Sequence, residues 1–444
     1  MQIQLSDHFT YGKLIRFTLP SIAMMIFTSI YSVVDGFFVS NFAGKTPFAA
    51  INLIMPVLMI LGTVGFMFGT GGTALVAKTY GEGEPKKANR FFSLFVYVAF
   101  LVGLVLSVLG FVFIRPIAAA LGADGSLLED CVLYARISLI ALPFFILQVM
   151  FQSFFVAAEK PQLGLAVTVS SGIINMLLDA ALVLLLPQNL KLTGAAIATS
   201  MAQTAGGVIP LVYFSRKNSS ILRLGKTSWD GRAILQACLN GSSEFMSSIS
   251  MSFVGILYNL QLIRYAGENG IAAYGVIMYV SMIFSAVFLG YSIGAAPVVS
   301  YHDGAKNYDE LKSLLRKSLT MIGLFSICIV ISAEFFAVPL SKFFVGFDGA
   351  LFNLTVSGFR ISAVSFGFMG FAIFSSDFFT ALNDGLTSAL ISFLRTLVFE
   401  TAAILLLPFL WGIDGIWFSV VASEMMAVLL GSLFLVLKRK KYHY

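Results

Sequence analysis

The sequence contains very little charge. Asp, Glu, Lys and Arg together make up 11% of its 444 residues, whereas hydrophobic residues make up 58% and the mean hydropathy is +0.91. In a typical soluble domain about 25% of the residues are charged. A soluble protein this apolar would expose large hydrophobic patches. Most of the molecular surface is therefore expected to face lipid.

Cysteine and histidine are also scarce, with three of each. The cysteines, Cys131, Cys238 and Cys328, are far apart and show no CxxC spacing, and the histidines are dispersed, so no metal site is indicated. The net charge of +6 is not gathered into basic clusters interleaved with aromatics, which argues against a nucleic-acid partner. There is no Walker A motif and no Ser/His/Asp or Cys/His constellation. We expect neither a cofactor nor an enzymatic activity.

Long apolar runs dominate what is present. Each is long enough to cross a bilayer as a helix, which takes about 20 residues. They lack the strict alternation of barrel strands, so the predicted class is an all-α integral membrane protein. Twelve spans are predicted, near 14–39, 48–77, 91–114, 134–158, 162–187, 192–215, 233–263, 270–300, 314–337, 357–383, 386–409 and 413–437.

The basic residues predict the orientation of these spans. With the N-terminus inside, 21 of the 28 Lys and Arg residues fall on the cytoplasmic side and 7 on the outside. Cytoplasmic loops of membrane proteins are enriched in Lys and Arg. We therefore expect a multi-pass protein of a prokaryotic plasma membrane with both termini in the cytoplasm.

The sequence contains an internal repeat of six spans. Phe48–Met55 matches Ile271–Met278 at an offset of 223 positions, and at the same offset Gly81 matches Gly304 and Pro116 matches Pro339. An even number of spans per repeat means that both halves enter the membrane in the same sense. The predicted layout is two six-helix lobes, 1–214 and 233–444, related by a parallel pseudo-two-fold axis along the membrane normal and joined by a cytoplasmic linker, 215–232.

Two motifs on these spans resemble those of a known family. Pro20, Tyr31 and Asp35 lie on the first span, and Asn175 and Asp179 form an Asn-x-x-x-Asp motif on the fifth. Together with the twelve spans and the linker, they resemble multidrug and toxic compound extrusion (MATE) antiporters, with the greatest similarity to the prokaryotic proton-coupled branch. The resemblance implies a secondary active antiporter that exports amphipathic, cationic drugs or toxic metabolites by alternating access, in exchange for H⁺ or Na⁺.

The carboxylates of the first lobe are the predicted coupling site. Asp35 and Asp179 lie inside the predicted spans of this lobe, whereas its basic residues Arg16 and Arg136 lie only at span ends, and two nearby carboxylates in a low dielectric do not both stay ionised. At least one is expected to bind H⁺, or Na⁺ between the two. Tyr31, Asn175 and Thr199 are predicted to complete this site, and Pro20 to be a hinge of the first span. The alternative is a buried hydrogen-bonded network that only holds helices together.

The second lobe contains an arginine among its acids. Arg395 lies within reach of Glu400, and of Glu424 at a similar depth, and we predict a structural ion pair between Arg395 and Glu400 because buried charges are usually paired. Glu244 and Asp377 lie off the spacing of the acidic positions in sodium-coupled relatives, so the resemblance is not extended to them. A role at a gate or substrate site and a role as acids reaching the interface remain open for both.

Substrates are expected to be small amphipathic molecules. Met150 and Phe154 on the fourth span, with Gln203 on the sixth, are candidates to line an adaptable pocket. The protein is expected to work in the lipid bilayer as a monomer. Two other functions remain open: a flippase for lipid-linked saccharides, for which a cleft lined with Arg and Lys is expected, and a membrane-embedded transferase, which needs clustered catalytic residues.

Overall fold

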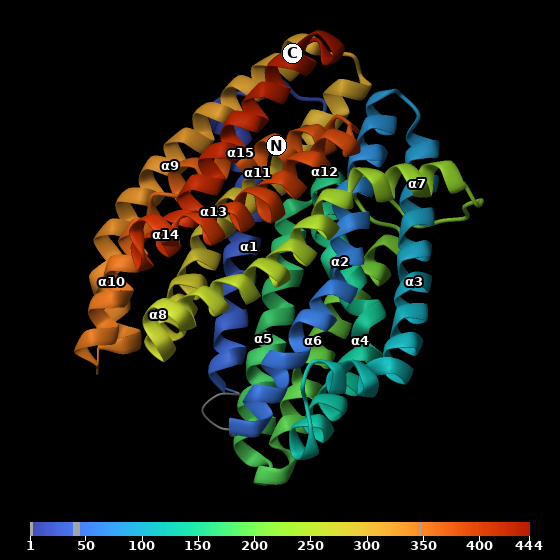
Figure 1. The fold of residues 1–444 in the computed structure, drawn as a ribbon. Helices are drawn as coiled ribbons and strands as arrows, with labels where there is room; N and C mark the ends of the chain where they lie inside the picture. Colours follow the sequence, from blue (N-terminus) through green and yellow to red (C-terminus); the bar gives the residue numbers. More distant parts are fainter. Residues whose placement is uncertain (1–2, 39–44, 347) are drawn as a thin grey trace.

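The computed structural model describes residues 3–38, 45–346 and 348–444, except for the side chains of 35–38 and 45. Within these ranges the regular structure is helical (Figure 1). The helices are α1 (Tyr11–Phe38), α2 (Lys45–Gly81), α3 (Pro85–Ala120), α4 (Gly125–Ala157), α5 (Pro161–Leu185), α6 (Lys191–Ser215), α7 (Gly231–Asn240), α8 (Ser242–Gly304), α9 (Tyr308–Val345), α10 (Gly349–Ala363), α11 (Phe366–Ala381), α12 (Gly385–Phe393), α13 (Glu400–Leu406), α14 (Pro408–Trp411) and α15 (Ile413–Tyr442). A 3₁₀ turn at Gln188–Leu190 precedes α6, and a π-helix at Leu394–Phe399 joins α12 to α13.

The described helices account for twelve spans. Ten are long and apolar enough to cross a membrane, and α10 and α11 form one further span bent by 48°. Helix α8 contains 63 residues, about 95 Å if it were straight, or three bilayer thicknesses. It contains two spans, because the chain breaks its helical conformation at Gly267, where φ is 62°, a value that glycine adopts readily. The prediction of an all-helical membrane protein with twelve spans is confirmed.

Two predicted spans differ from the structure. The seventh was expected to begin at residue 233, but residues 231–240 form the separate helix α7, and the membrane helix begins at Ser242. Asp230 caps α7 by accepting hydrogen bonds from the backbone N–H groups of Arg232 and Ala233. The tenth was expected to be one continuous helix and is instead bent between Ala363 and Phe366. Charge-free runs show where apolar chain lies but not where the helix axis turns.

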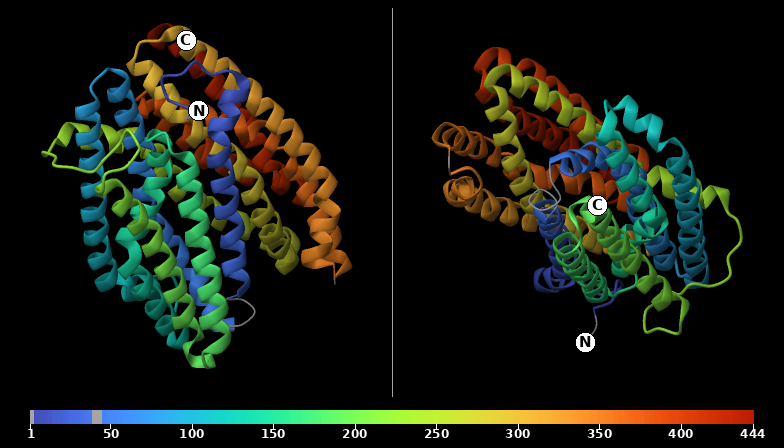
Figure 2. Two further views of the ribbon diagram at one scale, coloured as in Figure 1. Left: turned by 180° about the vertical axis from the view of Figure 1, so that it is seen from behind. Right: turned by 90° about the horizontal axis from the view of Figure 1, so that it is seen from below.

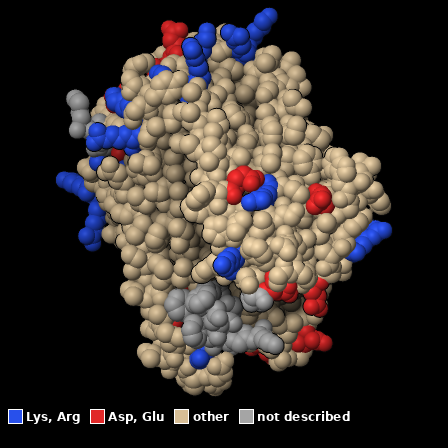
Figure 3. All heavy atoms as spheres, turned by 90° about the vertical axis from the view of Figure 1, so that its left-hand side faces the viewer, with Lys and Arg blue, Asp and Glu red and all other residues tan. Residues whose placement is uncertain are grey.

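Each half of the chain has its own hydrophobic core. One core contains buried residues between Ala50 and Ala237, and the other is built mainly from residues between Val254 and Tyr444. The second core also takes in Leu5, Phe9 and the first turns of α1. Apolar side chains also cover much of the outer surface, and Figure 3 shows Lys and Arg most densely placed toward the end of the molecule that carries both termini. We call this the termini end (Figures 1 and 2).

The two lobes meet closely at the termini end. A Cβ atom added at Gly81 would lie 2.1 Å from the carbonyl oxygen of Tyr301, and one added at Gly304 would lie 2.1 Å from that of Lys78. The two contacts are equivalent, because Gly81 and Gly304, like Lys78 and Tyr301, are separated by the 223 positions of the repeat. Only glycine permits helices to approach this closely. The lobes are therefore packed backbone to backbone about a pseudo-two-fold axis.

Candidate cation-binding sites in the two lobes

The polar cluster of the first lobe lies between α4, α5 and α6. Asp179 and Asn175, one turn apart on α5, are 0% and 1% exposed. The Gln148 amide of α4 donates to Ser171 Oγ of α5 at 3.2 Å, and that hydroxyl donates to the Ala202 carbonyl of α6 at 2.6 Å. Within the described residues, Asn175 Nδ2 and Thr199 Oγ1 have no hydrogen-bond partner. Two polar groups of this lobe therefore retain unused hydrogen-bonding capacity.

Helix α1 packs directly against α5, which carries Asn175 and Asp179 of this polar cluster. A Cβ added at Gly172 of α5 would lie 2.5 Å from the Phe27 ring and 3.2 Å from the Tyr31 ring, so this glycine permits α1 to approach α5. Asp35 lies one turn beyond Tyr31 on α1, but its side chain is outside the described part of the structure. Pro20 lies inside α1, which is one unbroken helix. The hinge and the coupling site remain predictions.

Met150 and Phe154 do not line a cleft in this conformation, and their substrate role remains a prediction. Both side chains are fully buried in the core of the first lobe. The Phe154 ring lies 5.0 Å from the Phe92 ring, and Met150 packs beside Gly69 of α2. Helix α4 is the most buried span of its lobe, so its aromatic residues pack against other helices instead of lining a cleft. Gln203 is partly buried on α6, and its role remains a prediction.

The arginine of the second lobe binds a different acid from the one predicted. Arg395 Nη2 lies 2.7 Å from Glu424 Oε1, and Arg395 Nε lies 2.9 Å from Glu424 Oε2. This bidentate pair is largely shielded, with side-chain exposures of 16% and 6%. The predicted pair with Glu400 is therefore wrong, because Glu424 on α15 binds the guanidinium of Arg395. Arg395 lies in the π-helix, a local distortion that is frequent at functional sites.

Three further carboxylates gather near this pair. Glu244 of α8 and Asp377 of α11 lie close enough to interact electrostatically with each other and with Arg395. Glu400 lies near Arg395 and Glu424. Glu244, Asp377 and Glu400 are partly buried, and no ion pair involving them is found among the described residues. Glu244 and Asp377 therefore belong to one electrostatic cluster, and their role, at a gate or substrate site or as acids that reach the interface, remains a prediction.

Sequence reasoning missed two aromatic neighbours of this cluster. Tyr258 and Tyr274, on the two arms of α8, stack with centroids 4.9 Å apart, and Tyr258 lies beside Glu400. No hydrogen bond of good geometry links that hydroxyl to the carboxylate. The repeat pairs Phe48–Met55 with a segment that includes Tyr274 and so draws attention to this stretch, but it gives no sign of the stacking.

Sequence reasoning also missed the seal at the termini end. The N–H of Leu5 donates to Glu159 Oε1 of the first lobe at 2.7 Å, and the N–H of Phe9 donates to Glu310 Oε1 of the second at 2.8 Å. The segment before α1 thus bridges both lobes, with the Leu5 and Phe9 side chains fully buried. Burial raises the pKa of Glu159 above its ordinary value, and the neighbouring Asp7 carboxylate adds to this effect.

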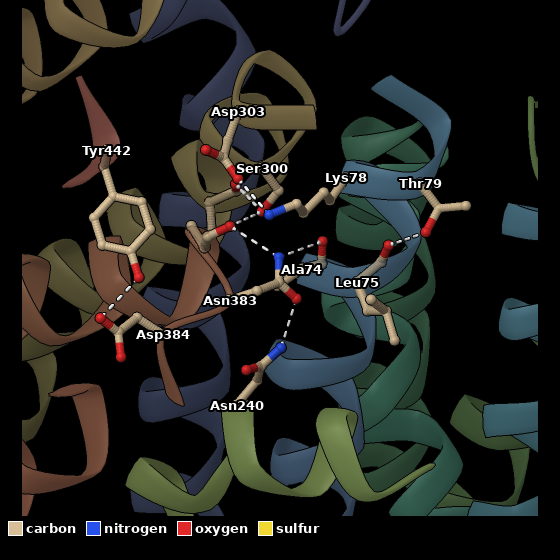
Figure 4. Close-up of polar contacts among 12 residues, drawn as sticks. Ala74, Leu75, Lys78, Thr79, Asn240, Ser300, Asp303, Asn383, Asp384 and Tyr442 are labelled. Carbon is tan, nitrogen blue, oxygen red and sulfur yellow. Dashed lines mark hydrogen bonds and ion pairs between the residues drawn. The ribbon is translucent and has the colours of Figure 1, made fainter. Parts of the chain in front are cut away.

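Polar contacts between α2 and the second lobe complete this seal (Figure 4). Lys78 Nζ lies 2.8 Å from Asp303 Oδ2. Asn383 Nδ2 donates to the Ala74 carbonyl at 3.3 Å, while Asn383 Oδ1 accepts from Asn240 at 2.6 Å. In this conformation the lobes are held shut at the termini end.

The described residues contain no group of three or more His, Cys, Asp or Glu side chains arranged to hold a metal ion.

Two six-helix lobes, a single linker and buried ionisable groups in both lobes define a polytopic membrane transporter. The chain belongs to the MatE family, whose profile matches residues 20–181 and 245–404. It is a transporter and not an enzyme.

Similar proteins come from staphylococci. The chain is 27% identical over 323 residues to the multidrug export protein MepA of Staphylococcus haemolyticus (strain JCSC1435), which covers 72% of this chain and 71% of that protein. It is 24% identical over 437 residues to MepA of Staphylococcus aureus (strain MRSA252), which covers 97% and 94%.

Solved structures share the fold. A crystal structure of a MATE protein in complex with MaL6 superposes with a TM-score of 0.92 at 19% identity and covers 98% of both chains. A multidrug resistance MATE transporter in an outward-facing conformation gives a TM-score of 0.92 at 20% identity, covering 98% of this chain and 97% of that one. The twelve-helix, two-lobe layout is confirmed by these likenesses.

Proposed function

We propose that this protein is a secondary antiporter that exports amphipathic cationic drugs or toxic metabolites in exchange for H⁺ or Na⁺. The observation that carries the proposal is the charge balance in the second lobe. Glu244, Asp377 and Glu400 gather around one arginine that Glu424 already binds. Carboxylates in excess of their counter-charges inside a membrane protein favour binding of protons or cations. The name of the staphylococcal relatives, multidrug export protein, supports the same substrate class.

We propose that the partly buried ring of Tyr274, stacked on the buried Tyr258, contributes to binding organic cations when the second lobe opens. The stacked rings of Tyr258 and Tyr274 lie beside Glu400. Aromatic faces attract cations, and a neighbouring carboxylate strengthens that attraction. An amphipathic cation would therefore find both an apolar face and a negative charge in this lobe.

The first lobe supplies the proposed coupling site. Asp179 and Asn175 are buried on α5, and Tyr31 brings α1 against the same helix, while Thr199 of α6 is proposed to complete the site. Asp35 follows Tyr31 by one turn, and Pro20 is the proposed hinge of α1. Binding of H⁺ or Na⁺ at the two aspartates would change the charge next to α1, so ion occupancy and substrate occupancy would be linked reciprocally.

The proposed transport cycle is alternating access by a monomer. The described conformation is shut at the termini end by the glycine contacts and by the Lys78–Asp303 ion pair. We place that end in the cytoplasm of a bacterial cell, because the sequence has three times as many Lys and Arg on that side as on the other. Substrate would then leave from the opposite end.

The test is transport of a fluorescent organic cation by purified protein in proteoliposomes, with H⁺ and Na⁺ gradients imposed separately. Uptake driven by either gradient in the wild type, and its loss in Asp179→Asn, is the expected result. The matched control is Glu129→Gln, an exposed acid of α4 that pairs with Arg115 at the surface. Transport that ignores both gradients would refute antiport, and movement of a lipid-linked saccharide in place of the cation would support the flippase.

A further inference from the structure

The linker between the lobes is bound along one face of α3. Asn89 Oδ1 accepts from the N–H of Arg223 at 2.7 Å, and Ser93 Oγ accepts from the N–H of Gly225 at 3.0 Å. The Tyr97 hydroxyl donates to the Gly225 carbonyl at 3.2 Å. Residues 89, 93 and 97 follow one another at intervals of four and so share one face of the helix. These hydrogen bonds hold the linker in place on α3, and we call this bound segment the strap.

This strap and the first turns of α3 border an open basic cavity of about 350 Å³. Four of the residues that line it are basic: Lys86, Arg90, Arg223 and Lys226. Its other lining residues, Pro85, Asn89, Ser93 and Gly225, carry no charge. A volume of this size lies within the range of small-molecule sites. The cavity thus has room for a compact group and an excess of positive charge around it.

The acids near this cavity are engaged elsewhere. Glu84 binds Lys87 at 2.8 Å, and Asp230 caps the start of α7. Among the described residues, no carboxylate forms an ion pair with any of the four basic side chains of the cavity; Arg90 donates to the neutral Ser228 hydroxyl at 2.5 Å. The four basic side chains of the cavity therefore form no ion pair within the described structure and are available to bind an external anion.

The same face of α3 continues from the cavity into apolar surface. Below Tyr97, the side chains of Leu101, Leu104 and Val108 are exposed, and this spacing keeps them on the face that holds the linker. Trp229 follows Ser228, the partner of Arg90, in the linker and is 76% exposed, as expected of an aromatic residue at a membrane interface. A phosphate bound in the cavity would have lipid-facing helix next to it.

We propose that this cavity binds the phosphate headgroup of an anionic phospholipid in the membrane leaflet at the termini end, with the acyl chains lying along α3. Arginine and lysine suit phosphate oxygens, and basic pockets at the membrane surface recognise anionic headgroups. The apolar stripe of α3 favours a lipid over a free phosphate ion, because it offers the acyl chains a surface directly below the headgroup.

The test uses delipidated full-length protein in detergent and native mass spectrometry. The protein is titrated in separate arms with phosphatidylglycerol, with phosphatidylcholine of the same chain length, and with inorganic phosphate. We expect preferential binding of phosphatidylglycerol. The variant Arg223→Gln/Lys226→Gln, which removes two side chains that make no hydrogen bond or ion pair within the described structure, should weaken that binding about 30-fold.

The matched control is Lys312→Gln/Arg316→Gln, which removes two exposed charges from α9 at the same end of the molecule. It should change the affinity less than about threefold, a factor that corresponds to less than one surface charge. Lys86→Gln/Lys226→Gln provides a second pocket variant if the first unfolds, as judged by its thermal midpoint. Equal binding of the two lipids, or equal loss in pocket and control variants, would overturn the proposal. Displacement of phosphatidylglycerol by inorganic phosphate at equal concentration would assign the cavity to free phosphate instead.

Discussion

The Arg395–Glu424 pair permits a quantitative prediction about the second lobe. Its three contacts, of 2.7 to 3.0 Å, are charge-assisted, and both side chains are largely shielded. Removing one partner of a buried pair costs about 3–5 kcal/mol, because it leaves the other charge without its partner. Replacing both partners by uncharged groups of similar volume is often neutral. The double variant Arg395→Met/Glu424→Gln should therefore be more stable than at least one of the single variants.

The two single variants should not be equally damaging. After Glu424→Gln, Arg395 still has Glu400, Glu244 and Asp377 nearby. The loss in free energy of unfolding should therefore be at or below the lower end of the 3–5 kcal/mol range, about 3 kcal/mol. After Arg395→Met, four carboxylates remain without a cation, and the loss should reach the upper end, about 5 kcal/mol. Acidic pH should restore part of the stability of Arg395→Met only, because protonation removes the excess negative charge.

The assay is a double-mutant cycle on equilibrium unfolding in mixed detergent micelles. With losses of about 3 and 5 kcal/mol in the single variants, a double variant that is more stable than Arg395→Met requires a coupling energy above about 3 kcal/mol between the two positions. The matched control is the pair Arg360–Glu334, whose atoms are 3.7 Å apart and whose side chains are about half exposed. Its coupling should stay below about 1 kcal/mol. Coupling no larger than that of the control, or equal losses in the two single variants, would refute this account of the cluster.

Three further predictions concern other parts of the molecule. Asp179→Asn should fold like the wild type, because the change is near-isosteric, but should lose gradient-driven transport in proteoliposomes; an unchanged rate and pH response would make Asp179 structural. Gly304→Val should part the lobes at the termini end, since its Cβ would lie 2.1 Å from the Lys78 carbonyl oxygen. Overpacking at this contact should destabilise the closed form by about 1–3 kcal/mol, which corresponds to a 5- to 150-fold shift of the closed–open equilibrium toward the open form. Spin-label distances between the lobes measure that shift, and Gly255→Val, which meets nothing within 4 Å, is its control. Asp384→Asn should loosen the C-terminal turns of α15 by about 1–3 kcal/mol, because two side chains there lose their anionic acceptor; unchanged amide exchange of residues 438–444 would count against it.

Hydropathy and the internal repeat were sufficient to predict most of the fold. A span needs only a run of apolar residues of the right length, and this is a local property of the sequence. The breaks were harder to predict. Gly241 separates α7 from α8, and the bend before Phe366 depends on how α10 and α11 pack. Such breaks are set by tertiary contacts that a hydropathy pattern does not contain.

The candidate sites were less predictable from sequence, because they depend on which helices meet. Glu400 is five residues from Arg395 and Glu424 is 29 residues away, yet the distant acid binds the arginine, since the π-helix and α15 place it there. Met150 and Phe154 have the composition of an adaptable pocket, but the central position of α4 buries them. Composition suggested the chemistry of these residues, and helix packing decided which of them have room for a ligand.

The reciprocal glycine contacts also bear on the origin of the chain. Gly81 rests on the backbone at Tyr301, and Gly304 rests on the backbone at Lys78, one contact made twice by equivalent residues. A two-fold homodimer makes its interface in this way, with the same patch used on both subunits. A six-helix ancestor that dimerised through this surface would already have possessed the seal, and gene duplication followed by fusion through a linker would have preserved it. The two halves would then have been free to diverge inside, so that the first lobe now carries Asp179 on α5 and the second carries glutamates beside Arg395.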